Sequence, residues 1–177
     1  LNGHTQKRRL VIDMRDLNAL LDRCSTNLAR SREIWMSLRA HAGGCSVLAD
    51  IREAFYRMRF LESLVICLYM GSSTGTPVEV WSRRLCFGTS FGPGCLQQCI
   101  QPMQKLVMSK LQERGLTDVL AALYVDDNSM SGRDPHSLAK LVATTLLTFG
   151  RCAFEMALKK FHCLACPSLR NVFIEKL

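Results

Sequence analysis

Long hydrophobic runs are missing from this chain of 177 residues. Its longest apolar stretches, Leu64–Met70 and Val119–Val125, are about seven residues long, whereas a membrane-spanning helix needs roughly 20. The sequence also lacks the basic segment followed by an apolar segment that marks a secretion signal. Internal repeats and low-complexity tracts are absent too. We therefore expect a soluble, intracellular protein, cytoplasmic or nuclear, that contacts no membrane.

Acidic residues are few relative to basic ones: 15 Asp plus Glu stand against 23 Lys plus Arg, a formal net charge of +8. Such a balance favours a polyanionic partner, usually nucleic acid, although a basic surface can also serve solubility alone. With 48% hydrophobic residues, the chain is long enough for one sizeable core or two small interleaved subdomains. Because it opens on Leu1 and polar, basic sequence, we expect a segment of a longer polypeptide.

The nine cysteines are an odd number and stand mostly in apolar surroundings. Free thiols in a reducing compartment fit this pattern better than disulfides. Cys163 and Cys166, preceded by His162, have the spacing of metal ligands, but no second pair stands at a matching distance. A structural zinc needs four ligands, so we do not expect one here.

Hydrophobic periodicity predicts two helices. Apolar residues recur at helical spacing over residues 93–113, and Gly115 follows as a stop signal. Asp134 is the expected cap, and Pro135 the expected first turn, of a second helix that ends at Gly150.

Short apolar or alternating runs between turn signals predict strands. The segment 9–18 reads as a strand leading into a loop or short helix. The other expected strands are 46–50, followed by a helical turn; 64–70 and 78–87, joined by a turn as a hairpin; 119–125 with a partner after it; and short pieces in the tail after residue 151. An antiparallel sheet with two helices on one face would bury this order, so the sequence predicts an α+β fold.

The stretch AALYVDDNSMSG, residues 121–132, places Asp126 and Asp127 directly after an apolar run. That run reads as a strand buried on both faces, where a carboxylate is costly. Asp127 and Asn128 suit a hairpin turn. Adjacent carboxylates also suit a metal site, since a cation between them relieves their repulsion. These residues alone leave both interpretations open.

Asp50 ends another apolar run, SVLAD, in the same position as Asp126 relative to its own run. If the two strands are neighbours in one sheet, Asp50, Asp126 and Asp127 meet at a common edge. Three carboxylates there would suit Mg²⁺, which prefers oxygen ligands. Two such ions about 4 Å apart can activate a hydroxyl and stabilise a leaving phosphate. In a basic protein this arrangement suggests phosphoryl transfer on nucleic acid.

Five segments, in order, resemble the fingers and palm of a retroelement (retrotransposon-type) reverse transcriptase, over nearly the whole chain. They are RLVIDMRDLN (9–18), LADIREAF (48–55), LCFGTSFGPGCLQQ (85–98), YVDD (124–127) and FEMALKK (154–160). The resemblance implies a polymerase right-hand palm, an antiparallel ferredoxin-like sheet with helices on one face, plus partial fingers and no thumb. It divides the chain into fingers at 1–45, palm at 46–60, a fingers hairpin at 61–90 and palm again at 91–177.

The resemblance also implies a catalytic centre. Asp50, Asp126 and Asp127, together with Ile51, would hold two Mg²⁺ ions, for which Mn²⁺ is a possible substitute. The ions would bridge the primer 3′-hydroxyl and the phosphates of the incoming nucleotide. Lys160 would protonate the leaving pyrophosphate, with the adjacent lysine as the alternative.

Further residues are implied to bind substrate. Arg9 with Lys7 or Arg8 would reach the triphosphate, unless the latter two form only a basic surface. Backbone amides of Glu53 and Ala54 would hold phosphate oxygens. The remaining implied substrate-binding residues are Phe55 beneath the sugar, where it would select deoxynucleotides; Gly88, Pro93 and Gln97 in the nucleotide and template pocket; and Tyr124 at the primer end. Alternatives are a core role for Phe55, an exposed helical position for Gln97 and packing on the long helix for Tyr124.

The sequence departs from the family pattern at Cys86, where Pro is usual, at Leu96, where Phe is usual, and at Gly94. The primer-grip segment near the end of the chain is only faintly similar. The implied partners are an RNA or DNA template with primer, dNTPs, and the rest of a polyprotein with a thumb and possible RNase H and integrase or recombinase parts.

Two alternatives to an active reverse transcriptase are open. A degenerate or domesticated copy would keep the fold and bind nucleic acid without polymerising. An RNA-dependent RNA polymerase would have a small polar residue where Phe55 stands, so the aromatic favours DNA synthesis. Retention of Phe55 and Gln97 alongside the three aspartates argues against decay.

Overall fold

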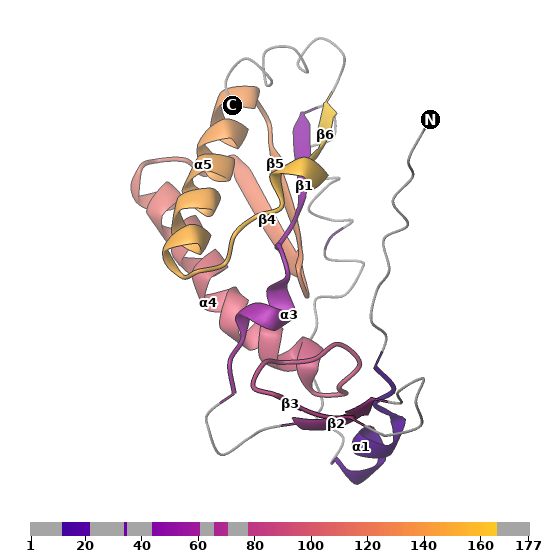
Figure 1. Cartoon of the computed structure of the whole chain (residues 1–177). Helices are drawn as coiled ribbons and strands as arrows, with labels where there is room; N and C mark the ends of the chain where they lie inside the picture. The colour runs from indigo at the N-terminus through magenta and orange to yellow at the C-terminus, as the bar shows by residue number, and fades with distance from the viewer. Residues whose placement is uncertain (1–11, 22–33, 35–43, 61–65, 71–77, 166–177) are drawn as a thin grey trace, which may run out of the picture.

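The computed structural model shows an α+β fold, in which a four-stranded antiparallel sheet packs against two main helices. It describes residues 12–21, 34, 44–60, 66–70 and 78–165 (Figure 1). The expectations for Arg9, Lys7, Arg8 and Cys166, for the turn at 71–77 and for the primer-grip segment lie outside these residues. Within the described ranges, no helix is long and apolar enough to cross a membrane.

The sheet has the strand order β4-β5-β1-β6, and all neighbours run antiparallel. β1 therefore lies inside the sheet, between two strands that come much later in the sequence. The four strands are β1 (Cys45–Asp50), β4 (Val119–Tyr124), β5 (Asp127–Gly132) and β6 (His162–Ala165).

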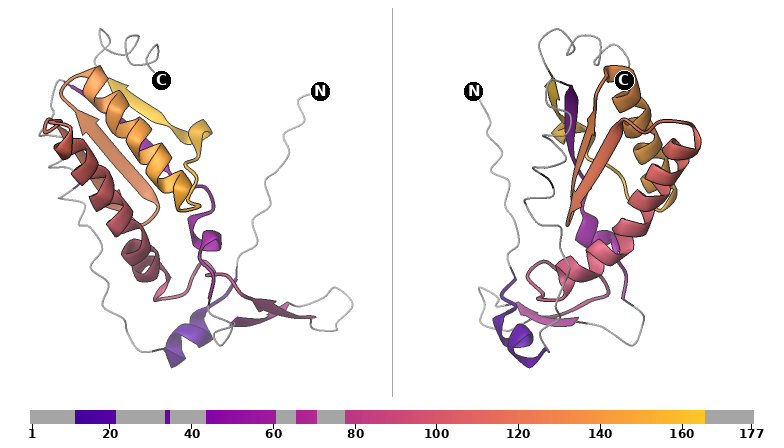
Figure 2. Two further views of the ribbon diagram at one scale, coloured as in Figure 1. Left: turned by 90° about the vertical axis from the view of Figure 1, so that its left-hand side faces the viewer. Right: turned by 180° about the vertical axis from the view of Figure 1, so that it is seen from behind.

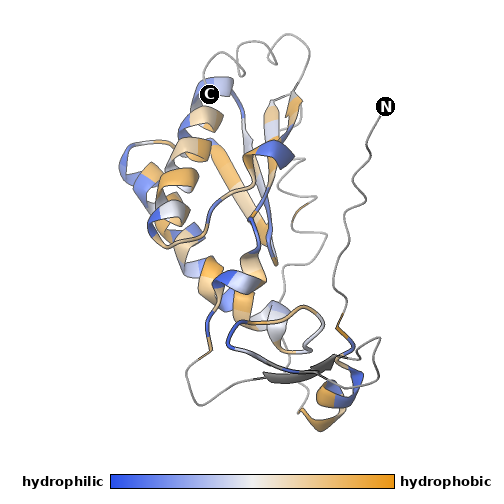
Figure 3. Cartoon of the chain, in the orientation of Figure 1, coloured by the Kyte–Doolittle hydropathy of each residue, from blue (hydrophilic) through white to orange (hydrophobic). Residues whose placement is uncertain are grey.

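Two long helices, α4 (Gly92–Glu113) and α5 (Pro135–Arg151), lie side by side on one face of the sheet (Figure 2). Apolar residues return turn by turn along both helices (Figure 3), and these residues form the core against the sheet. The fully buried members on the helices include Leu96, Ile100, Val107 and Leu111 of α4 and Leu138, Leu141, Val142 and Phe149 of α5. Both predicted helices are confirmed.

The helix ends are also where the sequence signals place them. Gly115 has a φ of 74°, and its N–H donates to the Gln112 carbonyl, while the Leu116 N–H donates to the Leu111 carbonyl. These two bonds form a Schellman motif that ends α4. At the start of α5, Oδ1 of Asp134 accepts hydrogen bonds from the N–H groups of His136 (2.8 Å) and Ser137 (3.0 Å).

The strand at 119–125 is buried on one face only, so the prediction of burial on both faces is wrong. Val119 and Leu123 face the helices and are buried, whereas Leu120 and Tyr124 are 38% and 42% exposed. Successive strand residues point to opposite faces, and both helices cover the same face. The opposite face, which we call the open face, carries Leu48 and Asp50 of β1 and the alternate residues of the other strands.

α1, α3 and the β2–β3 hairpin lie around the start of α4, whereas η1 lies beside β1 (Figure 1). The predicted hairpin is confirmed by the antiparallel pairing of β2 with β3, although β3 is shorter than expected because Ser82 Oγ and Arg84 hydrogen-bond each other at its end. The tail contributes a short 3₁₀ turn and β6. The small elements are α1 (Arg15–Leu20), α3 (Ala54–Arg57), β2 (Ile66–Met70), β3 (Val78–Ser82) and η1 (Leu158–Lys160).

Replacing Asp134 with Ala should lower the free energy of unfolding by about 1 kcal/mol at neutral pH, because two N–H groups at the start of α5 lose their acceptor. The hydrogen bonds to Ser137 and His136 lower the pKa of Asp134. A lowered pKa in the folded state stabilises above the unfolded value and is lost as the pH falls through the folded one.

The difference between wild type and Asp134→Ala should therefore shrink as the protein is acidified toward and below pH 3.8. Urea unfolding at several pH values measures it, with Asp16→Ala, at an exposed position of α1, as the matched control. A difference that does not change on acidification would show that the cap is not the cause.

Candidate active site

Strand pairing brings the three aspartates together. In the register of β1 and β5, Asp50 stands directly opposite Asp127. Just beyond the ladder, the N–H of Ile51 donates to the carbonyl of Asp126 at 3.1 Å. The expectation that the strands ending at Asp50 and before Asp126 are neighbours is wrong, because β5 lies between β4 and β1. The aspartates still meet at a common edge, because β5 starts directly after the turn at Asp126 and pairs with β1.

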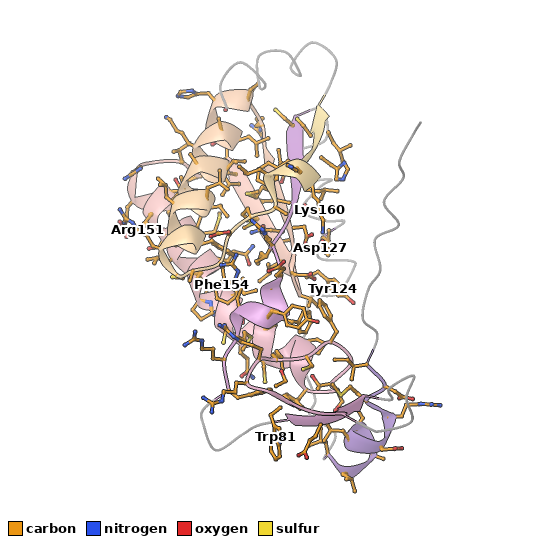
Figure 4. All side chains as sticks on the ribbon, in the orientation of Figure 1. Trp81, Tyr124, Asp127, Arg151, Phe154 and Lys160 are labelled. Atoms are coloured by element: carbon orange, nitrogen blue, oxygen red, sulfur yellow. The ribbon has the colours of Figure 1, made fainter. Side chains whose placement is uncertain are left out.

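The aspartates line a cavity of about 540 Å³ at the open face. Its polar lining comes from all four strands or the segments next to them: Asp50, Tyr124, Asp126, Asp127, Asn128, Ser129, Lys160 and His162. Tyr124, Asp127 and Asp50 form one cross-strand row, and Ala122, Ser129, Leu48 and His162 form the next. Figure 4 shows Tyr124, Asp127 and Lys160 on the same side of the molecule.

Tyr124 is at the rim of this cavity, on the face away from α4. The alternative that it packs on the long helix is therefore wrong. A ring that is exposed beside the carboxylates is free to contact a bound molecule.

The turn that carries Asp126 is strained at Val125, whose φ is 56°. Only two residues connect β4 to β5, and the left-handed conformation is rare for a β-branched side chain. The structure holds the turn from the helix side: Oε1 of Gln97 accepts a hydrogen bond from the Val125 N–H at 3.2 Å. Gln97 is only 6% exposed, so the alternative of an ordinary exposed helix residue is wrong.

Burial and like charges disfavour ionisation of the two turn carboxyls. Burial raises the pKa of Asp126, and the carboxylates of Asp127 and Asp50 raise it further, against an opposing effect of Lys160. Burial followed by Asp50 raises the pKa of Asp127. A nearby cation would favour the ionised forms.

Lys160 supplies one positive charge at this site, because its ammonium forms an ion pair with Oδ2 of Asp50. The backbone supports the pair: the Ala157 N–H donates to the Asp50 carbonyl at 2.7 Å, and the Lys160 N–H donates to the Ala157 carbonyl at 2.7 Å. Of the two adjacent lysines, Lys160 lines the cavity.

The donor set fits a hard divalent cation in its chemistry. Among the described residues, no three His, Cys, Asp or Glu side chains converge closely enough to enclose a metal ion. Mg²⁺ does not require such a cage, because it keeps several waters and is commonly held by one or two carboxylates plus substrate phosphates. The side chain of Ile51 is buried in the core, so only its backbone oxygen is available as a ligand.

The implied sugar-contacting residue, Phe55, is buried in the hydrophobic core. Its ring lies 4.5 Å from that of Phe87, centroid to centroid. A Cβ placed on Gly92 would be 3.2 Å from the Phe55 ring, so this glycine permits α4 to begin against it. Phe55 does not line the cavity of the aspartates within the described residues.

The other implied phosphate and nucleotide contacts are near the starts of helices. Glu53 precedes α3 with a φ of 53°. The N–H of Ala54 belongs to the first turn, where it has no acceptor within the helix. Pro93 is in the first turn of α4, and Gly88 has a φ of 93° in the loop before it.

Two residues whose side chains hydrogen-bond segments around the site were not predicted from the sequence. Asn18 donates to the Gly88 carbonyl and accepts from the Ser90 N–H, both at 2.7 Å. Arg57 joins α3 to the segment after α5, through Glu155 Oε2 at 2.9 Å and the Ala153 carbonyl at 3.2 Å. Asn18 is the last residue of the motif RLVIDMRDLN, so its position in that motif could have pointed to it. Apart from its charge, nothing in the sequence pointed to Arg57.

No family model matches this chain, and no curated protein matches it. The function is therefore inferred from the geometry above and from the motifs in the sequence.

Replacing Gln97 with Met should lower the free energy of unfolding by about 1–3 kcal/mol, because the Val125 N–H loses its acceptor in a partly buried turn. Hydrogen exchange at Val125 should accelerate in the same variant. Gln98→Met, at the exposed neighbouring position, is the matched control and should change neither quantity. Unchanged exchange at Val125 in Gln97→Met would contradict the role of Gln97.

Replacing Asp126 with Asn should raise the free energy of unfolding at pH 7 by up to about 1 kcal/mol, after allowance for solvent screening. A raised pKa means that the folded chain keeps the proton to a higher pH than the unfolded chain. The destabilisation by Asp126 is therefore full above the raised pKa and absent below the ordinary value of 3.8.

Urea unfolding at pH 7 and near the ordinary pKa of 3.8 measures this change. The gain should be present at pH 7 and vanish on acidification, whereas Asp16→Asn should produce no gain at either pH. A gain of equal size at both pH values would contradict the electrostatic explanation.

Proposed function

We propose that this chain is the palm and part of the fingers of a reverse transcriptase, an RNA-directed DNA polymerase of a mobile genetic element. The observation that carries the proposal is the pairing of β1 with β5, which places Asp50 beside Asp126 and Asp127 at one cavity. These are the aspartates of the two motifs that resemble the family's catalytic motifs. The net charge of +8 supports a nucleic-acid partner.

The topology supports the same assignment. The order β1-α4-β4-β5-α5-β6, with sheet order β4-β5-β1-β6, follows the βαββαβ pattern of ferredoxin-like domains. The α3 turn and the β2–β3 hairpin are inserted between β1 and α4. In the proposed polymerase the inserted β2–β3 hairpin belongs to the fingers, and the open face of the sheet carries the cavity of the aspartates.

In the proposed reaction, the primer 3′-hydroxyl attacks the innermost phosphate of a dNTP and pyrophosphate leaves. Asp50, Asp126 and Asp127 would hold two Mg²⁺ ions, with Mn²⁺ as a possible substitute. Bound Mg²⁺ supplies neutralisation of the phosphate charge and a lower pKa for the attacking hydroxyl. Gln97 keeps the turn of Asp126 in place, and Tyr124 lies exposed where a primer end would approach. Lys160 provides an ammonium within the cavity as a proton donor to the leaving group.

Primer extension on an RNA template with dNTPs and Mg²⁺ tests the proposal. The longest available chain that contains this segment should extend the primer, and Asp126→Asn should reduce extension to background, because a neutral amide is a far poorer Mg²⁺ ligand than a carboxylate. Asp16→Asn removes the same charge at an exposed position of α1 and should retain extension.

The result also separates the alternatives. Absence of extension, with primer–template binding retained, would overturn the polymerase and favour a degenerate nucleic-acid-binding copy. Extension with NTPs in preference to dNTPs would favour an RNA polymerase.

A further inference from the structure

The ion pair between Lys160 and Asp50 occupies a ligand atom of the proposed cation site. Oδ2 of Asp50 accepts the Lys160 ammonium. A cation that binds the same carboxylate competes with this contact, because two neighbouring positive charges repel each other. Asp126, Asp127 and Lys160 line the same cavity, so the ammonium that pairs with Asp50 shares this cavity with all three carboxylates.

The two partners differ in their freedom to move. The Asp50 side chain is 17% exposed and is fixed at the end of β1, whereas the Lys160 side chain is 61% exposed. An ion pair with one well-solvated partner is weak, because the ammonium is hydrated when it leaves. A doubly charged ion interacts more strongly with the same carboxylate at a similar distance.

A second observation points to a ligand in this cavity. Ser129 is only 4% exposed and lines the cavity from the open face, one row from Asp127. Its hydroxyl oxygen has no hydrogen-bond partner among the described residues. Buried hydroxyls are ordinarily paired, and a water held by a bound cation is a partner of suitable chemistry.

We propose that Lys160 is a displaceable internal counter-ion: a divalent cation that binds Asp50 displaces the Lys160 ammonium and frees it within the cavity. The inference rests on the proposed function, since it concerns the same aspartates. Without a divalent cation, Lys160 limits the repulsion among the carboxylates. With the cation bound, the released ammonium is available to the phosphates of a nucleotide. Lys160 therefore sets the affinity of the site for the cation.

Mn²⁺ binding, with free Mn²⁺ measured by electron paramagnetic resonance, tests the inference without any need for activity. Lys160→Met should bind Mn²⁺ about three- to fivefold more tightly than wild type, which is the equilibrium factor of a solvated ion pair. Lys160→Arg keeps the competing charge and should bind like wild type.

Lys159→Met is the matched control, because it removes the same charge from the exposed neighbouring residue. It should change the affinity by less than about 1.5-fold at physiological ionic strength, where exposed charges are screened. Asp50→Asn should abolish the difference between the Lys160 and Lys159 variants.

A direct readout of displacement is the ¹³Cε resonance of Lys160 in the otherwise unaltered protein. It should move on addition of Mg²⁺ and approach the position it has in Asp50→Asn without Mg²⁺. This measurement decides the question even if Lys160→Met fails to fold.

Three results would overturn the inference. An Asp50-dependent Mn²⁺ affinity that Lys160→Met leaves unchanged would reject displacement and leave the proposed function intact. A Lys160 resonance that does not respond to Mg²⁺ in a chain that binds it would do the same. Absence of Mn²⁺ binding in wild type and all variants would reject both the inference and the cation site of the proposed function.

Discussion

The pairing of β1 with β5 is the contact on which the rest of the site depends. β1 is an inner strand, and its register sets Asp50 opposite Asp127 and Ile51 beside the carbonyl of Asp126. Register in a sheet with one buried face is strongly specified, because a slip of one residue would turn Val47 out of the core and Asp50 into it. The same hydrophobic alternation that stabilises the fold therefore brings the carboxylates together.

One face of the sheet contributes the hydrophobic core, and the other face carries the candidate active site. α4 and α5 bury one face, and the apolar core lies there. The open face carries small and polar side chains near its centre, among them Ala122, Ser129 and Asp127, and these leave room for a cavity. Carboxylates are tolerated at this edge because water reaches them and Lys160 pairs with Asp50. Burial first, and then the neighbouring carboxylates, raise the pKa values of Asp126 and Asp127, as is common at functional sites.

Features set by neighbouring residues could be predicted from the sequence, whereas features set by packing could not. The extent of α4, its end at Gly115 and the cap at Asp134 follow from local rules, and all are present. The sequence also predicted that the aspartates meet at one edge, but through the wrong pairing, because β1 pairs with β5 and not with β4. One-sided burial of 119–125 depends on which face the helices cover, which composition alone does not show. The bond from Val125 to Gln97 likewise depends on how α4 meets the hairpin.

Asn18 connects α1 to the segment that precedes α4. Its two hydrogen bonds fasten α1 to the backbone at 88–90, immediately before α4 begins. Gln97 lies in the first turns of α4 and accepts a hydrogen bond from the Val125 N–H in the β4–β5 turn. α1 is thus connected to the turn that carries Asp126 through three hydrogen bonds and the first turns of α4.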